Sequence, residues 1–146
     1  MIEISKGIYF SSKREDMDFK MIYCFIKDSY WGALRTEEEQ KTAMDNTINF
    51  GLFHDKKQIA YARVMTDKIF FAYLLDVLVI KEYQGQGFSK VLMREILNFP
   101  ELKNIDKWML ATKDAHGLYE KYGFTSIASP EKLMEKLNER AKKIYK

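Results

Sequence analysis

Residues 70–99 join an apolar run, a glycine-bearing turn and an amphipathic segment, and this combination restricts the fold more than any other feature. The run from Phe70 to Ile80 is too continuously apolar for a half-exposed strand and indicates a buried central strand. The polar turn that follows holds Gly85 and Gly87. Apolar residues then recur at helical spacing, at Phe88, Val91, Leu92, Ile96 and Phe99. A strand, a glycine turn and a helix form an anion site, because backbone N–H groups and the helix dipole converge there.

The turn itself has a specific pattern. Gln84-Gly85-Gln86-Gly87-Phe88-Ser89 resembles the pyrophosphate-binding motif of GCN5-related N-acetyltransferases (the GNAT family), usually written Q/R-x-x-G-x-G/A. Ser89 departs from the usual Gly or Ala, but it is small and keeps a free backbone N–H. The alternative is a tight turn between a strand and a helix without any ligand.

A second stretch resembles the same family. Residues 111–124 resemble the family's N-x-x-A-x-x-L-Y-x-x-x-G-F signature: Leu118-Tyr119-Glu120-Lys121-Tyr122-Gly123-Phe124 matches closely, and Asp114 stands where Asn is usual. The two motifs occur in the family's order. The resemblance implies the acyl-CoA N-acyltransferase (GNAT) fold, an α/β fold with a mixed central sheet and helices on both faces. It also implies a splay between the strands of Val77 and Leu110, with the co-substrate between them.

The resemblance further implies acetyl-CoA as co-substrate and assigns residues to it. The backbone of Val77, Leu78 and Val79 would pair with the pantetheine arm as a strand pairs with its neighbour. The pyrophosphate would bind the amides of a loop that comprises Gly85, Gln86, Gly87, Phe88, Ser89 and Lys90. Asp114 would contact pantetheine or, alternatively, cap its own helix.

Two side chains are candidates for the chemistry. Tyr119 stands where the family has the tyrosine that protonates the leaving thiolate; the alternative is a packed aromatic ring. Asp76 is a carboxylate within an apolar strand, where it is costly unless paired or neutral. It is the candidate base for the acceptor amine, with a raised pKa. The alternatives are a structural aspartate bonded to backbone, Tyr61, Arg63 or Tyr73, and a water chain as the base.

The acceptor pocket would lie at Tyr30, Trp31 and Tyr73. An aromatic pair can hold an amine or its alkyl part, whereas Arg35 or Arg63 would instead hold a substrate carboxylate. The sequence leaves these opposite preferences open. Tyr30 and Trp31 as simple anchors of a helix end are a further alternative.

Composition restricts the class of protein. With 146 residues, 47% of them hydrophobic, the chain is expected to form a single domain over residues 1–146, which the resemblance implies is an N-acetyltransferase domain. The net charge of +3 is too small and scattered to suggest nucleic-acid binding. The single cysteine, Cys24, which we expect in a core helix face, and the lack of an apolar leader favour the cytoplasm. No membrane segment and no metal site are expected.

The predicted element order is β-α-α-β-β-β-α-β-α-β. It comprises a strand over residues 2–10, helices capped by Asp16 or Asp18 and by Thr36, and a hairpin over residues 49–66. The central strand, the glycine turn and the helix follow, then a strand over residues 107–112 and the Tyr119 helix. A short strand over residues 125–127 and a helix from Ser129-Pro130 complete the chain. The second helix is expected on the surface.

We therefore expect an acetyl-CoA-dependent N-acetyltransferase that acts by direct transfer on a small amine. The alternatives are a non-catalytic CoA-binding or sensor module and an unrelated nucleotide-binding domain. The expected partners are acetyl-CoA and the amine, without nucleic acid or membrane, and a homodimer is left open.

Overall fold

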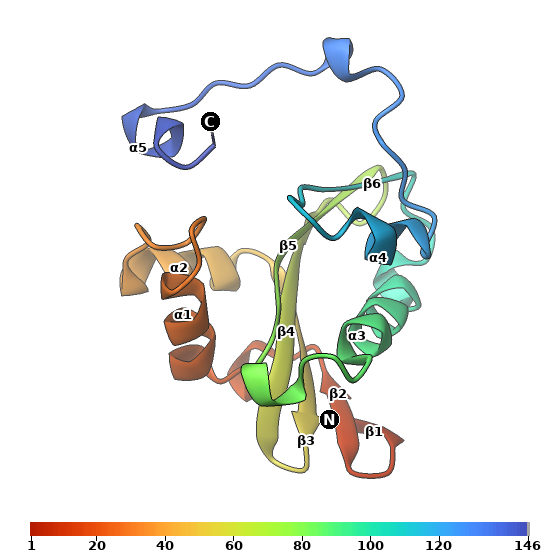
Figure 1. The fold of residues 1–146 in the computed structure, drawn as a ribbon. Helices are drawn as coiled ribbons and strands as arrows, with labels where there is room; N and C mark the ends of the chain where they lie inside the picture. The colour runs from red at the N-terminus through yellow and green to blue at the C-terminus, as the bar shows by residue number, and fades with distance from the viewer. Residues whose placement is uncertain (146) are drawn as a thin grey trace.

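The computed structural model describes residues 1–145 around one mixed sheet, with its six strands in the order β1-β2-β3-β4-β5-β6. Neighbouring strands are antiparallel except for β5 and β6, which are parallel. Helices α1 and α2 lie on one side of the sheet and α3 and α4 on the other (Figure 1). The strands are β1 (Ile2–Ser5), β2 (Ile8–Ser11), β3 (Ile48–His54), β4 (Lys57–Thr66), β5 (Phe71–Val79) and β6 (Lys107–Leu110).

The α-helices begin where the sequence offers caps. Asp18 accepts a hydrogen bond from the Met21 N–H at 3.1 Å, and Thr36 and Glu39 form a reciprocal capping box. The α-helices are α1 (Phe19–Lys27), α2 (Glu37–Asp45), α3 (Phe88–Leu97), α4 (His116–Glu120) and α5 (Glu139–Lys142). Short 3₁₀ turns occupy Arg14–Asp16, Lys81–Tyr83, Pro100–Leu102 and Pro130–Lys132.

The core fills both faces of the sheet. Ile22 and Ile26 of α1 are fully buried, as are Leu92, Met93 and Ile96 of α3. α2 lies on the surface as expected, with six of its nine residues exposed, but Gln40 and Met44, one helical turn apart, are both fully buried against the sheet. Cys24, expected in the core, is exposed on α1.

The two ends of the chain differ from the prediction. The first predicted strand is a hairpin of β1 and β2, which turns at Gly7 with a φ of 76°. Residues 125–127 form no strand, and the predicted C-terminal helix is reduced to a 3₁₀ turn and α5, which Asn138 caps through the Ala141 N–H. The apolar side chains of this segment are exposed or only half-buried, so the segment lacks the tertiary packing that would stabilise a longer helix. Leu133 and Met134 are among the exposed ones.

The segment after α4 crosses the molecule to the side of α1 and α2 (Figure 1). There Arg140 of α5 forms an ion pair with Glu39 of α2 at 2.8 Å. Among residues 1–145, no helix combines the length and the apolar character needed to cross a membrane.

Candidate functional site

The predicted splay is present between β5 and β6, although β6 is an edge strand of the sheet and not a central one. The pairing of β5 with β6 starts at Phe71 and Lys107 and ends at Leu74 and Leu110, although β5 continues to Val79. The edge of β5 that faces β6 therefore has no strand partner over residues 75–79. Val77, Leu78 and Val79 lie on this edge, where an extended ligand could pair with the backbone.

The glycine turn follows directly from this edge. Gly85 and Gly87 have φ values of 77° and 85°, and a Cβ atom added at either position would meet nothing within 4 Å. The backbone N–H groups from Gly85 to Lys90 have no hydrogen-bond acceptor in the described part of the chain. They comprise the loop and the first turn of α3, whose N-cap, Gly87, offers no side-chain oxygen. This arrangement has the donors and the dipole that an anion requires.

Two contacts hold the loop in place. The Gln84 side chain donates to the carbonyl of Val79 at 2.9 Å, which fixes the loop to the end of β5. The Tyr122 hydroxyl donates to the carbonyl of Lys90 at 2.9 Å and joins α3 to the turn after α4. Ser89 begins the helix as the second residue of α3, so its replacement of Gly or Ala leaves the geometry intact. The side chain of Lys90 is exposed.

Asp76 lies in a β-bulge of β5, at the point where β5 and β6 part. Tyr61 pairs with Leu78 and Arg63 with Leu75, so β5 has one residue more than β4 between these pairs. The bulge gives Asp76 a φ of 55° and turns its carboxylate toward α2. Asp76 Oδ2 accepts hydrogen bonds from Arg63 Nε at 2.7 Å, from Arg35 Nη1 at 2.9 Å and from Gln40 Nε2 at 3.3 Å.

These contacts change the expected role of Asp76. Burial would raise the pKa of Asp76, but the hydrogen bonds and charges of Arg35 and Arg63 outweigh burial and hold the pKa below its ordinary value. The raised pKa expected from the sequence is therefore wrong. The pairing with Arg63 agrees with the structural alternative, and the contacts of Arg35 and Gln40 with Asp76 were not predicted. Gln40 could have been found from its one-turn spacing to Met44 on α2.

Tyr119 lies on α4, and its ring packs edge-on against Phe124 at 6.0 Å between centroids. Burial raises the pKa of Tyr119, which keeps the phenol protonated near neutral pH. No hydrogen bond of its hydroxyl is found among residues 1–145. In this part of the chain, every unpaired polar side-chain atom is at least partly accessible to solvent. The hydroxyl is therefore reached by solvent and free to donate a proton.

Asp114 does not cap α4. Ala115 is the N-cap residue, and the Thr112 hydroxyl accepts from the Ala115 N–H at 3.1 Å. Asp114 is exposed before the helix. Counting back from Leu118-Tyr119 along the family's N-x-x-A-x-x-L-Y pattern places Thr112, not Asp114, at the Asn position, so that correspondence is also corrected. Contact of Asp114 with the co-substrate stays a prediction.

The predicted acceptor residues lie on the side of α1 and α2. Trp31 is half-buried, and the guanidinium of Arg35 lies 5.2 Å from the centroid of its ring. Tyr30 is 65% exposed, and Lys113 Nζ lies 5.4 Å from the centroid of its ring. Tyr73 stacks on Phe71, and burial, together with the charge of Tyr145, raises its pKa. Arg35 thus connects Trp31 with Asp76, whereas Tyr30 is joined to the loop after β6.

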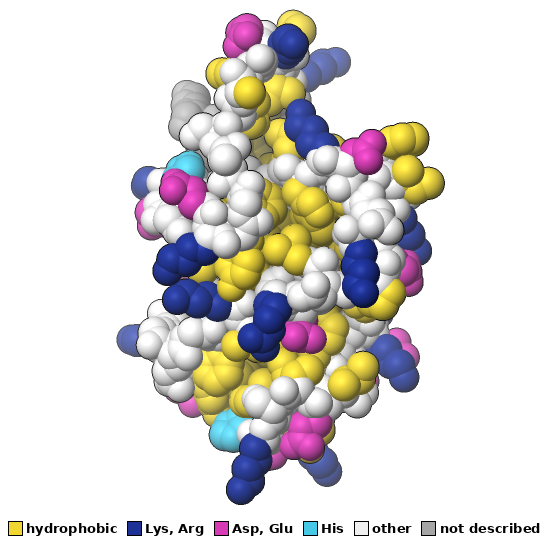
Figure 2. All heavy atoms as spheres, turned by 90° about the vertical axis from the view of Figure 1, so that its right-hand side faces the viewer, with side chains coloured by type: hydrophobic (Ala, Val, Ile, Leu, Met, Phe, Trp, Pro, Cys, Tyr) yellow, Lys and Arg dark blue, Asp and Glu magenta, His cyan; other side chains and the backbone are white. Residues whose placement is uncertain are grey.

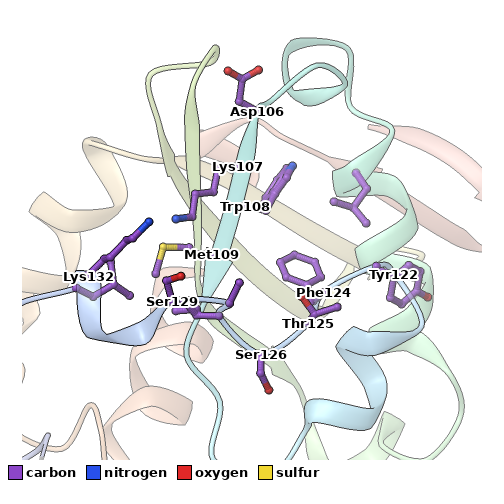
Figure 3. Close-up of a pocket in the computed structure, with 15 residues that line it drawn as sticks. Asp106, Lys107, Trp108, Met109, Tyr122, Phe124, Thr125, Ser126, Ser129 and Lys132 are labelled. Carbon is purple, nitrogen blue, oxygen red and sulfur yellow. The ribbon is translucent and has the colours of Figure 1, made fainter.

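A separate cavity of about 560 Å³ lies on the outer side of β6. Its wall consists of residues of β6 such as Trp108 and of the segment from Tyr122 to Leu133 (Figure 3). None of the predicted site residues lines this cavity. Residues 125–127, which were expected to form a strand, line this cavity instead.

Possible metal ligands and the charges on one face are two further features of the molecule. Among residues 1–145, no group of three or more His, Cys, Asp or Glu side chains is placed to hold a metal ion. On the face that carries α3 and α4, basic and acidic side chains are interspersed around exposed apolar ones (Figure 2).

Comparison with known proteins places these features in context. Residues 45–126 match a family described as an acetyltransferase (GNAT) domain. An uncharacterized N-acetyltransferase, ycf52, of Gracilaria tenuistipitata is 30% identical over 110 residues, which cover 71% of this chain and 59% of that relative's length. A crystal structure from Xanthomonas campestris, assigned to the GNAT family, is 38% identical with a TM-score of 0.86 and covers 90% of this chain and 93% of that one.

The fold also matches a more distant structure. An acetyltransferase of Clostridium acetobutylicum, described with acetyl-CoA, has a TM-score of 0.64 at 16% identity and covers 90% of this chain and 96% of that one. Identity this low shows the shared fold alone.

Proposed function

Since this chain belongs to the GNAT acetyltransferase family, we propose that it transfers the acetyl group of acetyl-CoA to the amine of a small molecule. The observation that carries the proposal is the continuity of two sets of free backbone groups. The unpaired edge of β5 over residues 75–79 leads directly into the free amides from Gly85 to Lys90. The C. acetobutylicum structure of the same fold, described with acetyl-CoA, supports the choice of co-substrate.

The edge of β5 over residues 75–79 and the amides from Gly85 to Lys90 together form a continuous binding strip. Each part of this strip has a binding role. The amides from Gly85 to Lys90 and the positive end of α3 bind the pyrophosphate. The backbone of Val77 to Val79 pairs with the amides of the pantetheine arm. Because the strip runs from the loop back along β5, the thioester end lies at the bulge of Asp76, where β5 leaves β6.

The chemistry at this end requires two proton movements. Acetyl-CoA supplies a thioester; the amine nitrogen forms a bond to its carbonyl carbon, and the bond from that carbon to sulfur breaks. Tyr119 gives its phenolic proton to the leaving thiolate and regains one from water. The amine loses its proton to water, because Asp76 is held ionised by two arginines and is a weak base. Asp76 thus acts as a positioning residue for Arg35.

The test has a binding arm and a turnover arm. Native mass spectrometry of the protein, purified without ligand and then mixed with CoA, should show a one-to-one complex. Free-thiol release from acetyl-CoA is then measured with a panel of amines, amino acids and polyamines, and at least one should exceed hydrolysis. Tight CoA binding without any accepted amine would instead support a sensor, and absence of CoA binding would overturn the proposal.

A further inference from the structure

The ion cluster at the bulge of β5 carries more positive than negative charge. Arg35 and Arg63 both form ion pairs with Asp76, at 2.9 Å and 2.7 Å, and they share one carboxylate oxygen. Neither arginine pairs with a second acid among residues 1–145. The remaining polar member, Gln40, is neutral. One carboxylate therefore faces two guanidinium groups, and the cluster keeps a surplus positive charge.

The surplus charge resides on guanidinium nitrogens that have no protein acceptor among residues 1–145. Arg63 uses only Nε toward Asp76, and Arg35 uses only Nη1 toward Asp76 and Gln40. The other guanidinium nitrogens have no partner in the described part of the chain. The side chain of Arg63 is only 9% exposed, yet no polar side-chain atom there is both buried and unpaired. The unpaired nitrogens of Arg63 are therefore not completely shielded from solvent.

The position of these nitrogens relates them to the reaction. They surround Asp76, at the end of the β5 strip assigned above to the thioester. They approach it from the side of α2, because Gln40 of α2 contacts the same carboxylate oxygen. An acceptor amine that reaches the thioester from this side passes beside them.

The aromatic residues nearby do not favour a cationic acceptor. The face of Trp31 already carries the guanidinium of Arg35, and the ring of Tyr30 already carries Lys113 Nζ. A second cation at either place would meet a like charge at close range. Of the two substrate preferences that the sequence left open, the contacts support the anionic one.

We propose that the acceptor carries an anionic group, a carboxylate or a phosphate, beside its amine, and that this group binds the free guanidinium nitrogens of Arg35 and Arg63. The planar guanidinium matches the two oxygens of such a group better than an ammonium does. This inference rests on the proposed acetyltransferase function and narrows its substrate class.

The experiment compares acceptors that differ in one group. Each α-amino acid is assayed against its carboxamide and against the amine that lacks the carboxylate, and ethanolamine phosphate is assayed against ethanolamine. In at least one of these two comparisons, we expect the kcat/KM of the acceptor that carries the anionic group to exceed the kcat/KM of the matching neutral acceptor at least tenfold. The first comparison reports a carboxylate and the second a phosphate.

Variants then assign the preference to the cluster. Arg35→Gln removes the more accessible surplus charge and should reduce the ratio of anionic to neutral kcat/KM toward one, mainly through KM. Arg35→Lys keeps the charge without the planar edge and should lose part of the ratio; it carries the test if Arg35→Gln does not fold. The matched control is Arg94→Gln, at an exposed side chain of α3, and it should leave the ratio unchanged. Affinity for acetyl-CoA should change less than twofold in all three.

The outcomes separate this inference from the function on which it rests. If neutral or cationic amines are acetylated as well as their anionic partners, or if Arg35→Gln leaves the ratio unchanged, the inference is overturned while acetyl transfer stands. If CoA binds but no amine of any charge accepts an acetyl group, the proposed function fails and the inference fails with it.

Discussion

Asp76 combines a strained backbone with a buried charge. A φ of 55° is rare for a residue with a Cβ, but aspartate tolerates it better than most. Its side chain is 1% exposed, so the charge persists only because three donors surround Oδ2. That a carboxylate in an apolar strand needs a partner could be predicted from sequence. The partner Arg35 could not, because it is 41 residues away in a loop whose path depends on the whole fold.

Asp76→Asn keeps the backbone preference and removes the charge. Breaking a buried ion pair on one side costs on the order of 3 kcal/mol of unfolding free energy. Because the pKa of Asp76 is lowered in the folded protein, its stabilisation is complete above the unfolded value of about 3.9 and is lost as the pH falls through the folded value. Urea unfolding should therefore show a constant difference between wild type and variant at neutral pH, which shrinks below about pH 4.

Asp76→Asn also tests whether Asp76 is the base that takes the proton of the acceptor amine. Asp76 is ionised throughout the neutral range, so the ascending limb of the pH–rate profile should remain in Asp76→Asn even if the rate falls. Disappearance of the limb would restore Asp76 as the base and contradict the role of water.

Tyr119→Phe removes one oxygen and keeps the ring that packs against Phe124. Loss of a general acid reduces rates by roughly 10²–10⁴, and we expect the low end, because a thiolate leaves without a proton more readily than most groups. Stopped assays of thiol release should show a kcat about a hundredfold lower, with CoA affinity unchanged by calorimetry. Full activity of a folded variant would reduce Tyr119 to a packing residue.

At the scale of elements, local chemistry decided what the sequence could predict. The caps Asp18 and Thr36, the apolar run of β5 and the glycines before α3 act within a few residues, and these elements lie where they were expected. Gly123 lies two residues past Lys121, the C-cap of α4, where its N–H donates to the carbonyl of Glu120 at 3.1 Å with a φ of 90°. The expected C-terminal helix did not form over its full length, because its apolar residues stay exposed or half-buried and gain no tertiary packing.

Gly87→Asp tests the loop as an anion site. At the N-cap of α3 the new carboxylate would accept the free amide hydrogens and repel pyrophosphate, while the open space around Gly87 accommodates the side chain. Acetyl-CoA affinity should fall at least about tenfold, or about 1.4 kcal/mol, by calorimetry. Gly87→Asn has the same shape without the charge and should lose less. Equal losses in both variants would point to backbone strain rather than to the anion.

At the scale of the whole molecule, the parting of β5 and β6 leaves the sheet incomplete beside its last strand. No periodicity encodes this parting; it follows from where β6 ends relative to the longer β5, and it was predicted only through the family resemblance. The surroundings of Asp76 likewise unite a loop, a helix and two strands. The sequence singles out Arg35, Arg63 and Asp76 separately. That the two arginines bind the same oxygen of Asp76 could be seen only in the folded structure.

An incomplete sheet should gain stability from the ligand that completes it. CoA that binds only the folded chain at a hundredfold excess over its Kd adds about 2.7 kcal/mol. For a chain of this length, that raises the Tm by roughly 5–10 °C. Calorimetric scans should show this shift in wild type and a smaller one in Gly87→Asp at the same CoA concentration. Hydrogen exchange should slow at residues 75–79 and 85–90 together, because one ligand covers both. Protection of the loop alone would mean that the arm does not pair with β5, and the strand edge would lose its assigned role.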